Sequence, residues 1–112
     1  MKKIEAIIRP EKLDVVRKAL DSSGYPGIMI TEIEGHGKQK GIVQQWRGEK
    51  YRVELLPKVK IELIVPDKDV DRIIKIIIEG ARTGSVGDGK IFVSDIKDAI
   101  RIRTGEKGEE AI

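Results

Sequence analysis

An internal repeat constrains the fold of this chain more than any other feature of its sequence. The segment IIRPEK at residues 7–12 resembles IVPDK at residues 64–68, and each follows an apolar strand pattern and opens a helix pattern. Pro10 suits a first helical turn, where its missing N–H has no partner to lose, and Asp67 places negative charge at a helix start. The sequence therefore predicts two copies of one strand–helix unit.

Helical periodicity follows each copy. Apolar residues recur there at helical spacing in two stripes, which consist of Leu13, Val16 and Leu20, and of Val70, Ile73, Ile74 and Ile77. Gly24 and Gly80 stand where these stripes stop, and glycine commonly follows the last turn of a helix. We therefore predict that these two glycines end the helices.

Strand patterns flank both helices. They cover residues 3–9, 28–34, 59–65 and 91–96. The order β-α-β-β-α-β predicts an α+β fold, a ferredoxin-like sandwich in one domain over residues 1–112. Its two helices cover one face of an antiparallel sheet. Because Ile and Val occur on both faces of several strands, we expect the open face to pack against another subunit in a homo-oligomer.

Composition narrows the classes of function. Hydrophobic residues make up 39% and charged residues 37%, and no apolar run approaches a membrane span. The N-terminus enters a strand pattern directly, so we expect no signal peptide. With no cysteine and one histidine, a disulfide framework, a thiolate metal site and a His-cluster site are excluded, and we expect a cytoplasmic location. The net charge of +3 permits anionic ligands without indicating nucleic acid.

A glycine-rich loop is the strongest candidate site. The stretch TGSVGDGKIFV covers residues 83–93, and residues 84–90 fit the first seven positions of a P-loop, G-x-x-x-x-G-K. A P-loop continues with Ser or Thr and a helix, whereas Ile91 here begins a strand pattern. The glycines either let backbone N–H groups approach a phosphate or form only a tight turn. A small ATP-hydrolysing enzyme is an alternative, but we find no residue placed as a base for water and no carboxylate pair, and predict that the chain is not an enzyme.

The connection between the second and third strands is unusually long. It covers about residues 37–55, and loops of this length are usually functional or disordered. It carries Trp46 and Tyr51, which either anchor an interface or pack back as minor core. A ferredoxin-like RNA-binding module is a further alternative, yet aromatic residues make up only 4% of the chain, too few for base stacking.

Several motifs together resemble one known family. TGSVGDGKIF at residues 83–92 matches a signature of the PII nitrogen-regulatory signal-transduction proteins, of the type associated with ammonium channels. WRGEKY at residues 46–51 partly matches a second signature, with Glu49 and Lys50 where the family usually has a small residue and Glu. GHGKQKG at residues 35–41, LPK at 56–58 and RIRTG at 101–105 also fit, so the resemblance covers essentially the whole chain.

The resemblance implies a homotrimer with ATP or ADP bound in the clefts between subunits. The phosphates would lie on the loop at residues 82–90, and Arg101 and Arg103, in the C-terminal segment 97–112, would come from the adjacent subunit. These two arginines alternate on a strand-like segment, so we expect both to face the same way. The implied nucleotide-binding residues are Met29, Gly37, Lys38, Gln39, Glu62, Ile64, Gly87, Asp88, Gly89, Lys90, Arg101 and Arg103. Met29 and Lys38 stand where the family often has Thr and Arg.

The resemblance also implies a second ligand and a partner. 2-Oxoglutarate would bind beside Mg-ATP, with the side-chain oxygen of Gln39 on the Mg²⁺ ion, through Gly37, Gln39, Lys40, Gly41 and Lys58. The long loop would enter the pore of a membrane ammonium channel, or contact glutamine synthetase or another nitrogen-assimilation enzyme, through Trp46, Arg47, Gly48 and Tyr51. The protein would then be attached peripherally to the membrane through its channel partner. Tyr51 is also the position modified in one branch of the family.

Overall fold

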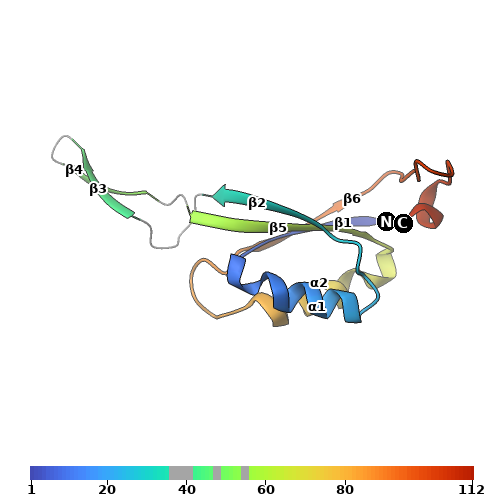
Figure 1. Ribbon diagram of the computed structural model, residues 1–112, viewed down its shortest axis with the longest axis horizontal. Coiled ribbons are helices and arrows are strands. Elements are labelled where there is room, and N and C mark those ends of the chain that lie inside the picture. Colours follow the sequence, from blue (N-terminus) through green and yellow to red (C-terminus); the bar gives the residue numbers. More distant parts are fainter. Residues whose placement is uncertain (36–41, 47–48, 54–55) are drawn as a thin grey trace.

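The computed structural model describes residues 1–35, 42–46, 49–53 and 56–112. Its main body is one four-stranded antiparallel sheet with the strand order β2-β5-β1-β6. These strands are β1 (Lys2–Ile8), β2 (Met29–Gly35), β5 (Leu56–Val65) and β6 (Lys90–Asp95). Two helices, α1 (Leu13–Ser22) and α2 (Val70–Ala81), lie on the same face of the sheet (Figure 1). The predicted α+β, ferredoxin-like arrangement is confirmed.

Alternation along the strands separates a core face from an open face. On β1 the buried residues are Ile4, Ala6 and Ile8, and each is paired with an apolar residue of β5. The helices add their apolar stripes to this face, and the buried core consists of Ile4, Ala6, Ile8, Val16, Leu20, Val59, Ile61, Leu63, Val65, Ile73, Ile77 and Ala81. All twelve are hydrophobic, so the core is held by burial of apolar side chains.

The repeated segments do open the helices, in the same way in both copies. A short 3₁₀ turn precedes each helix, η1 (Pro10–Lys12) before α1 and η2 (Asp67–Asp69) before α2. Pro10 occupies the first position of its turn, and Asp67 supplies negative charge to the other. The two segments, which resemble each other in sequence, therefore also have the same local structure.

The two glycines predicted to end the helices behave differently. Gly24 follows α1 with a φ of 94°, a left-handed conformation suited to a helix end. For Gly80 the prediction is wrong, because α2 continues through it to Ala81. A Cβ atom built on Gly80 would lie 3.1 Å from Cγ2 of Val16 on α1. Gly80 is thus placed where the two helices approach each other closely.

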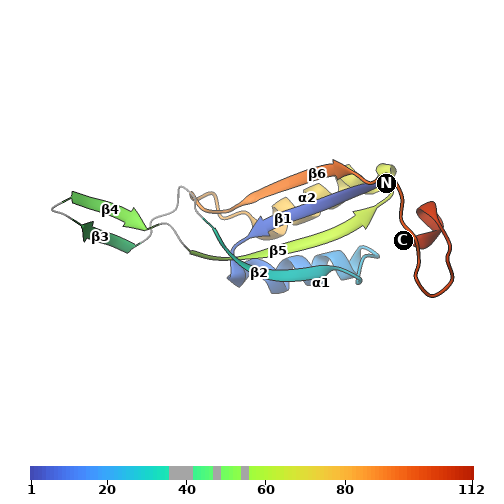
Figure 2. The ribbon, with the colours of Figure 1, turned by 90° about the horizontal axis from the view of Figure 1, so that it is seen from above.

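The open face of the sheet carries charged and apolar side chains together. Lys3 and Glu5 form an ion pair at 2.8 Å on β1, and Lys60 and Glu62 form one at 3.0 Å on the neighbouring β5. Figure 2 looks onto this face, which neither helix covers.

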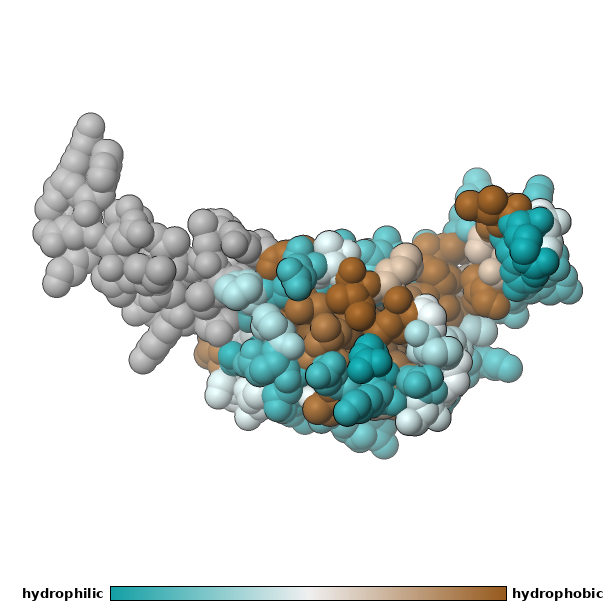
Figure 3. Space-filling model, viewed as in Figure 1, coloured by the Kyte–Doolittle hydropathy of each residue, from teal (hydrophilic) through white to brown (hydrophobic). Residues whose placement is uncertain are grey.

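In the view of Figure 3, brown apolar surface gathers between the sheet and the helices, with teal hydrophilic surface around it.

The long connection contains regular structure in its described parts. Two strands, β3 (Ile42–Trp46) and β4 (Glu49–Val53), form a separate antiparallel pair with a register from Ile42↔Val53 to Trp46↔Glu49. The sequence predicts a loop over this stretch, so the two strands are a difference from that expectation. Short strands within a connection carry too little alternation to be recognised alone.

The C-terminal segment leaves the sheet after β6 and ends in a 3₁₀ turn, η3 (Gly108–Ala111). Figures 1 and 2 place this segment beside the N-terminus, beyond the end of β6 that lies away from residues 82–89. Within the described residues, no helix has the length and apolar character needed to cross a membrane.

Candidate functional site

The glycine-rich loop is closed by one carboxylate. Asp88 Oδ2 accepts hydrogen bonds from the backbone N–H groups of Thr83 and Gly84, both at 2.9 Å, and Oδ1 accepts the Thr83 hydroxyl. The Thr83 hydroxyl and the backbone donors hold the pKa of the Asp88 carboxyl far below its usual range. Asp88 was predicted to bind nucleotide. Its side chain closes the loop, and its contact with a nucleotide stays a prediction.

Two basic side chains bind the other side of the loop. Arg9, directly after β1, donates from Nη2 to the Val86 carbonyl at 2.9 Å and from Nε to Asp88 Oδ1 at 3.2 Å. Lys58, on β5, donates to the Gly87 carbonyl at 2.6 Å. Burial, and then the nearby charge of Arg9, lower the pKa of the Lys58 amine. The structure therefore brings Lys58, predicted for the oxoacid, to the glycine-rich loop.

Arg9 was not among the predicted site residues. In the sequence it reads as the last residue of a strand before Pro10, and 77 positions separate it from Val86. The one available signal was a basic residue at the end of a strand in a ferredoxin-like fold, where it can approach the loop that leads into the neighbouring edge strand.

The backbone of the loop is fixed by glycines. Gly87 and Gly89 have φ values of 99° and 105°. A Cβ atom built on Gly89 would lie only 1.7 Å from the carbonyl oxygen of Ile7 on β1. Glycine is therefore required here by the approach of two backbones. No acceptor among the described residues pairs with the backbone N–H of Gly87, Asp88 or Gly89.

The predicted nucleotide residues on the strands share the open face. Met29 and Glu62 are direct cross-strand partners, and Ile64 follows on the same face of β5. Lys90 is the partner of Ile7, and Ile7 is also paired with Lys60. The row of Lys90 and the row of Ile64 are therefore separated by four residues of β5, about 13 Å. These side chains therefore lie in a row along the open face of the sheet, and the row begins at Lys90, next to the glycine-rich loop.

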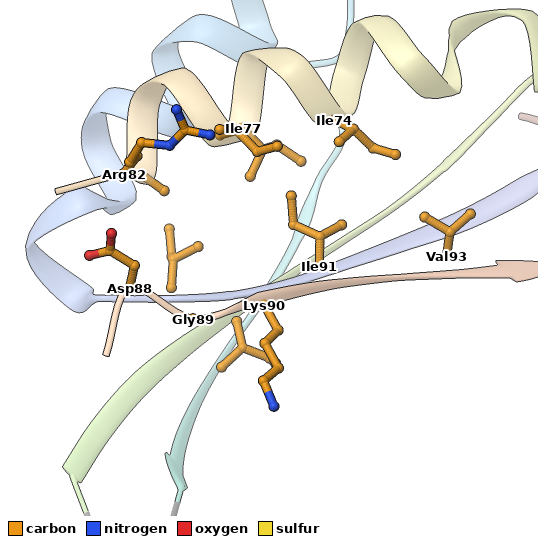
Figure 4. A pocket seen from close by; sticks show the side chains of 12 residues that line it. Ile74, Ile77, Arg82, Asp88, Gly89, Lys90, Ile91 and Val93 are labelled. Atoms are coloured by element: carbon orange, nitrogen blue, oxygen red, sulfur yellow. The ribbon is translucent and has the colours of Figure 1, made fainter. Parts of the chain in front are cut away.

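A pocket of about 430 Å³ lies on the opposite side of the sheet. Figure 4 shows Ile74 and Ile77 of α2 above Ile91 and Val93 of β6, whereas Lys90 points away, to the open face. The lining is mostly apolar. This pocket is therefore a gap between α2 and the edge strand, separate from the amine of Lys90.

The C-terminal arginines do not lie on a strand, so the prediction of a strand-like segment is wrong. The Arg101 N–H donates to the Glu106 carbonyl at 2.8 Å, and the Gly105 N–H donates to the Arg101 carbonyl at 2.7 Å. These bonds close a turn over residues 102–104, which is followed by Gly105 with a φ of 75°. The Arg101 guanidinium also binds Glu106 Oε2 at 2.9 Å and the Glu110 carbonyl at 2.8 Å.

Arg101 and Arg103 also lie far from the glycine-rich loop of their own chain. The loop leads into β6 at Lys90, and the C-terminal segment leaves β6 after Asp95. The length of β6, about 17 Å, therefore separates them (Figure 2). Within one chain these arginines and the loop do not form one site.

Part of the predicted site lies outside the described residues. This holds for Gly37, Lys38, Gln39, Lys40 and Gly41 of the implied ligand sites, and for Arg47 and Gly48 of the implied partner contact. For Trp46 and Tyr51 the structure gives the pairing of their strands and nothing about their side chains.

The fold and the loop define a class of protein: a ferredoxin-like α+β domain with a closed glycine-rich loop at one end of its open sheet face. The family model described as "Nitrogen regulatory protein P-II" matches residues 1–106, and the chain belongs to this family. It is 57% identical to the nitrogen regulatory protein P-II of Haemophilus influenzae over 112 residues, which is 100% of each chain. It is also 52% identical to nitrogen regulatory protein P-II 2 of Methanothermobacter thermautotrophicus, over 100% of this chain and 97% of the relative. Both relatives are named as regulatory proteins.

Proposed function

We propose that the chain is a nitrogen-regulatory sensor that binds ATP or ADP and 2-oxoglutarate between the subunits of a homotrimer. Through its long loop it inhibits an ammonium channel or modulates nitrogen-assimilation enzymes such as glutamine synthetase. The observation that carries this proposal is the glycine-rich loop. The N–H groups of Gly87, Asp88 and Gly89 have no acceptor among the described residues, and successive N–H groups of this kind suit an anion.

The arrangement of charges supports a site between subunits. Lys90 on the open face and Lys58 at the loop add positive charge to the unpaired N–H groups. Arg101 and Arg103, at the far end of β6, reach such a loop only from a second copy of the chain. A cleft between subunits would therefore join the glycine-rich loop of one chain to the C-terminal arginines of another. A trimer closes such an assembly with three equivalent sites.

The proposed ligands are tested together by calorimetry. Mg-ATP is titrated into the purified protein with and without 2-oxoglutarate. We expect ATP to bind alone, and 2-oxoglutarate to bind only when Mg-ATP is present. Binding of 2-oxoglutarate without nucleotide, or no binding of nucleotide at all, would contradict the proposed sensor.

Single substitutions test the phosphate contacts. We expect Lys90→Ala and Arg103→Ala each to weaken ATP binding at least tenfold, or about 1.4 kcal/mol for a charge-assisted contact. Lys18→Ala on the exposed side of α1 is the matched control and should leave the affinity unchanged. Normal ATP affinity in both variants would contradict the assignment of Lys90 and Arg103 as phosphate contacts.

The proposed output is tested separately. Arg47→Ala should abolish inhibition of ammonium transport in reconstituted vesicles and leave ATP affinity unchanged, because Arg47 would fill the channel and not the nucleotide cleft. A variant that still blocks transport would contradict the proposed role of Arg47 in the channel.

A further inference from the structure

Arg9 makes two contacts that the proposed function does not yet use. Its side chain is only 14% exposed and reaches both the Val86 carbonyl, at 2.9 Å, and Asp88 Oδ1, at 3.2 Å. Lys58 binds the next carbonyl along the loop, that of Gly87. Two successive carbonyls thus accept hydrogen bonds from basic side chains, Arg9 directly after β1 and Lys58 on β5.

These contacts fix the direction of the unpaired N–H groups. In a trans peptide the C=O and the following N–H belong to one plane and point in opposite directions. The described part of the chain has no cis peptide bond. The Val86 carbonyl shares its peptide unit with the Gly87 N–H, so a bond from Arg9 to that carbonyl turns the Gly87 N–H away from Arg9. The bond from Lys58 has the same effect on the Asp88 N–H.

The second contact of Arg9 holds the carboxylate that closes the loop. Asp88 accepts hydrogen bonds from the backbone N–H groups of Thr83 and Gly84, and Arg9, directly after β1, donates to its carboxylate. One guanidinium therefore binds the loop at two points, Val86 and Asp88. A lysine carries the same charge on a single nitrogen and lacks this fork.

We propose that Arg9 is a positioning residue for the phosphate-binding loop. It holds the Val86–Gly87 peptide and the Asp88 carboxylate so that the Gly87 N–H faces the phosphates of a nucleoside di- or triphosphate. This inference rests on the proposed function, since it assigns a role within the same nucleotide site. Arg9 acts through the loop and needs no contact with the nucleotide.

The test separates geometry from charge. Arg9→Lys keeps the positive charge and loses the fork, whereas Arg9→Met loses both. Arg17→Lys is the matched control, because Arg17 lies on α1 and its ion pair with Asp14 is long, at 3.6 Å. For each protein we would measure the dissociation constant of ATP by calorimetry, the melting temperature, and the amide NMR signals of the loop.

We expect Arg9→Lys to weaken ATP binding about fivefold or more and Arg9→Met at least as much, because charge-assisted contacts that order the loop are lost. The amide signals of Thr83, Gly84 and Gly87 should move in both variants, while the melting temperature of Arg9→Lys stays close to that of the original protein. Arg17→Lys should change none of these quantities.

Three results would overturn the inference. If the original protein binds ATP and both Arg9 variants bind it equally well, Arg9 does not position the loop and the proposed function stands. If Arg9→Lys binds normally and only Arg9→Met is impaired, Arg9 acts by charge alone. If the original protein binds no ATP, the inference and the proposed function fail together.

Discussion

The substitution Gly89→Ala tests the closest approach between the glycine-rich loop and the sheet. The added Cβ would lie 1.7 Å from the Ile7 carbonyl oxygen and 2.8 Å from the Ile7 carbonyl carbon. Both are backbone atoms of a central strand, so no side chain can rotate to make room. Reaching even 3.0 Å requires β1 and the start of β6 to separate by about 1.3 Å, a shift that disrupts close packing.

Two terms give the expected magnitude. An alanine at a φ of 105° costs on the order of 1–3 kcal/mol in backbone strain. Separating the strands weakens the pairing of Ile7 with Lys90, and each lost hydrogen bond removes about 0.5–1.5 kcal/mol of net stability. We therefore expect Gly89→Ala to lower the free energy of unfolding by about 3 kcal/mol or more.

Gly84 provides the matched control. Its φ is 89°, and a Cβ built there has no atom within 4 Å, so Gly84→Ala should carry the strain term alone. The measurement is urea denaturation followed by circular dichroism, at one subunit concentration because assembly would shift the midpoint. Equal losses in the two variants, within about 0.5 kcal/mol, would refute the argument from strand approach.

Two further expectations concern the helices and their connection. Gly80→Val should lower the free energy of unfolding by about 1–3 kcal/mol in the same urea assay, because a branched side chain enters the contact with Val16; an unchanged midpoint would show that the helices separate freely. Burial and the hydrogen bond to Asp69 raise the pKa of Tyr25 to about 12, so ultraviolet titration should show a tyrosine that ionises near pH 12, a step that Tyr25→Phe removes. Since the folded pKa of Tyr25 lies above the unfolded value of about 10, its contribution to stability is complete below about pH 10 and is lost as pH rises through 12; a protein equally stable at both pH values would contradict this.

The sequence predicted the fold because the signals for its elements are local. The alternation along β5 and the apolar stripes of α1 and α2 each lie within one short stretch of sequence. The repeated segments indicated where both helices begin. The error at Gly80 shows the limit of such signals. A glycine that ends a helix and a glycine that admits a neighbouring helix are the same residue in a sequence, and only the position of Val16 distinguishes them.

Some features of the candidate site were likewise predicted from the sequence, and others were not. The position of the glycine-rich loop was evident from the spacing of its glycines before a strand pattern, although that spacing alone also fits a tight turn. The turn at residues 102–104 was missed, because alternating Arg and Ile predict a strand. The hydrogen bonds from the Gly105 N–H to the Arg101 carbonyl, and from the Arg101 N–H to the Glu106 carbonyl, form the turn instead. The hydrogen bonds of Asp88 within the loop were not predicted, because the sequence does not reveal which donors a carboxylate in a glycine-rich loop faces.

The sequence by itself determined the order of the four strands of the main sheet and the two helices, the place of the glycine-rich loop and the family, because periodicity and motif are properties of neighbours in the chain. Only the tertiary structure brought Arg9 and Lys58 to Val86 and Gly87, and only it placed Gly89 against the backbone of β1. These contacts arise from the pairing of strands far apart in sequence. Their geometry depends on the register and packing of the whole sheet, which no short stretch of residues specifies.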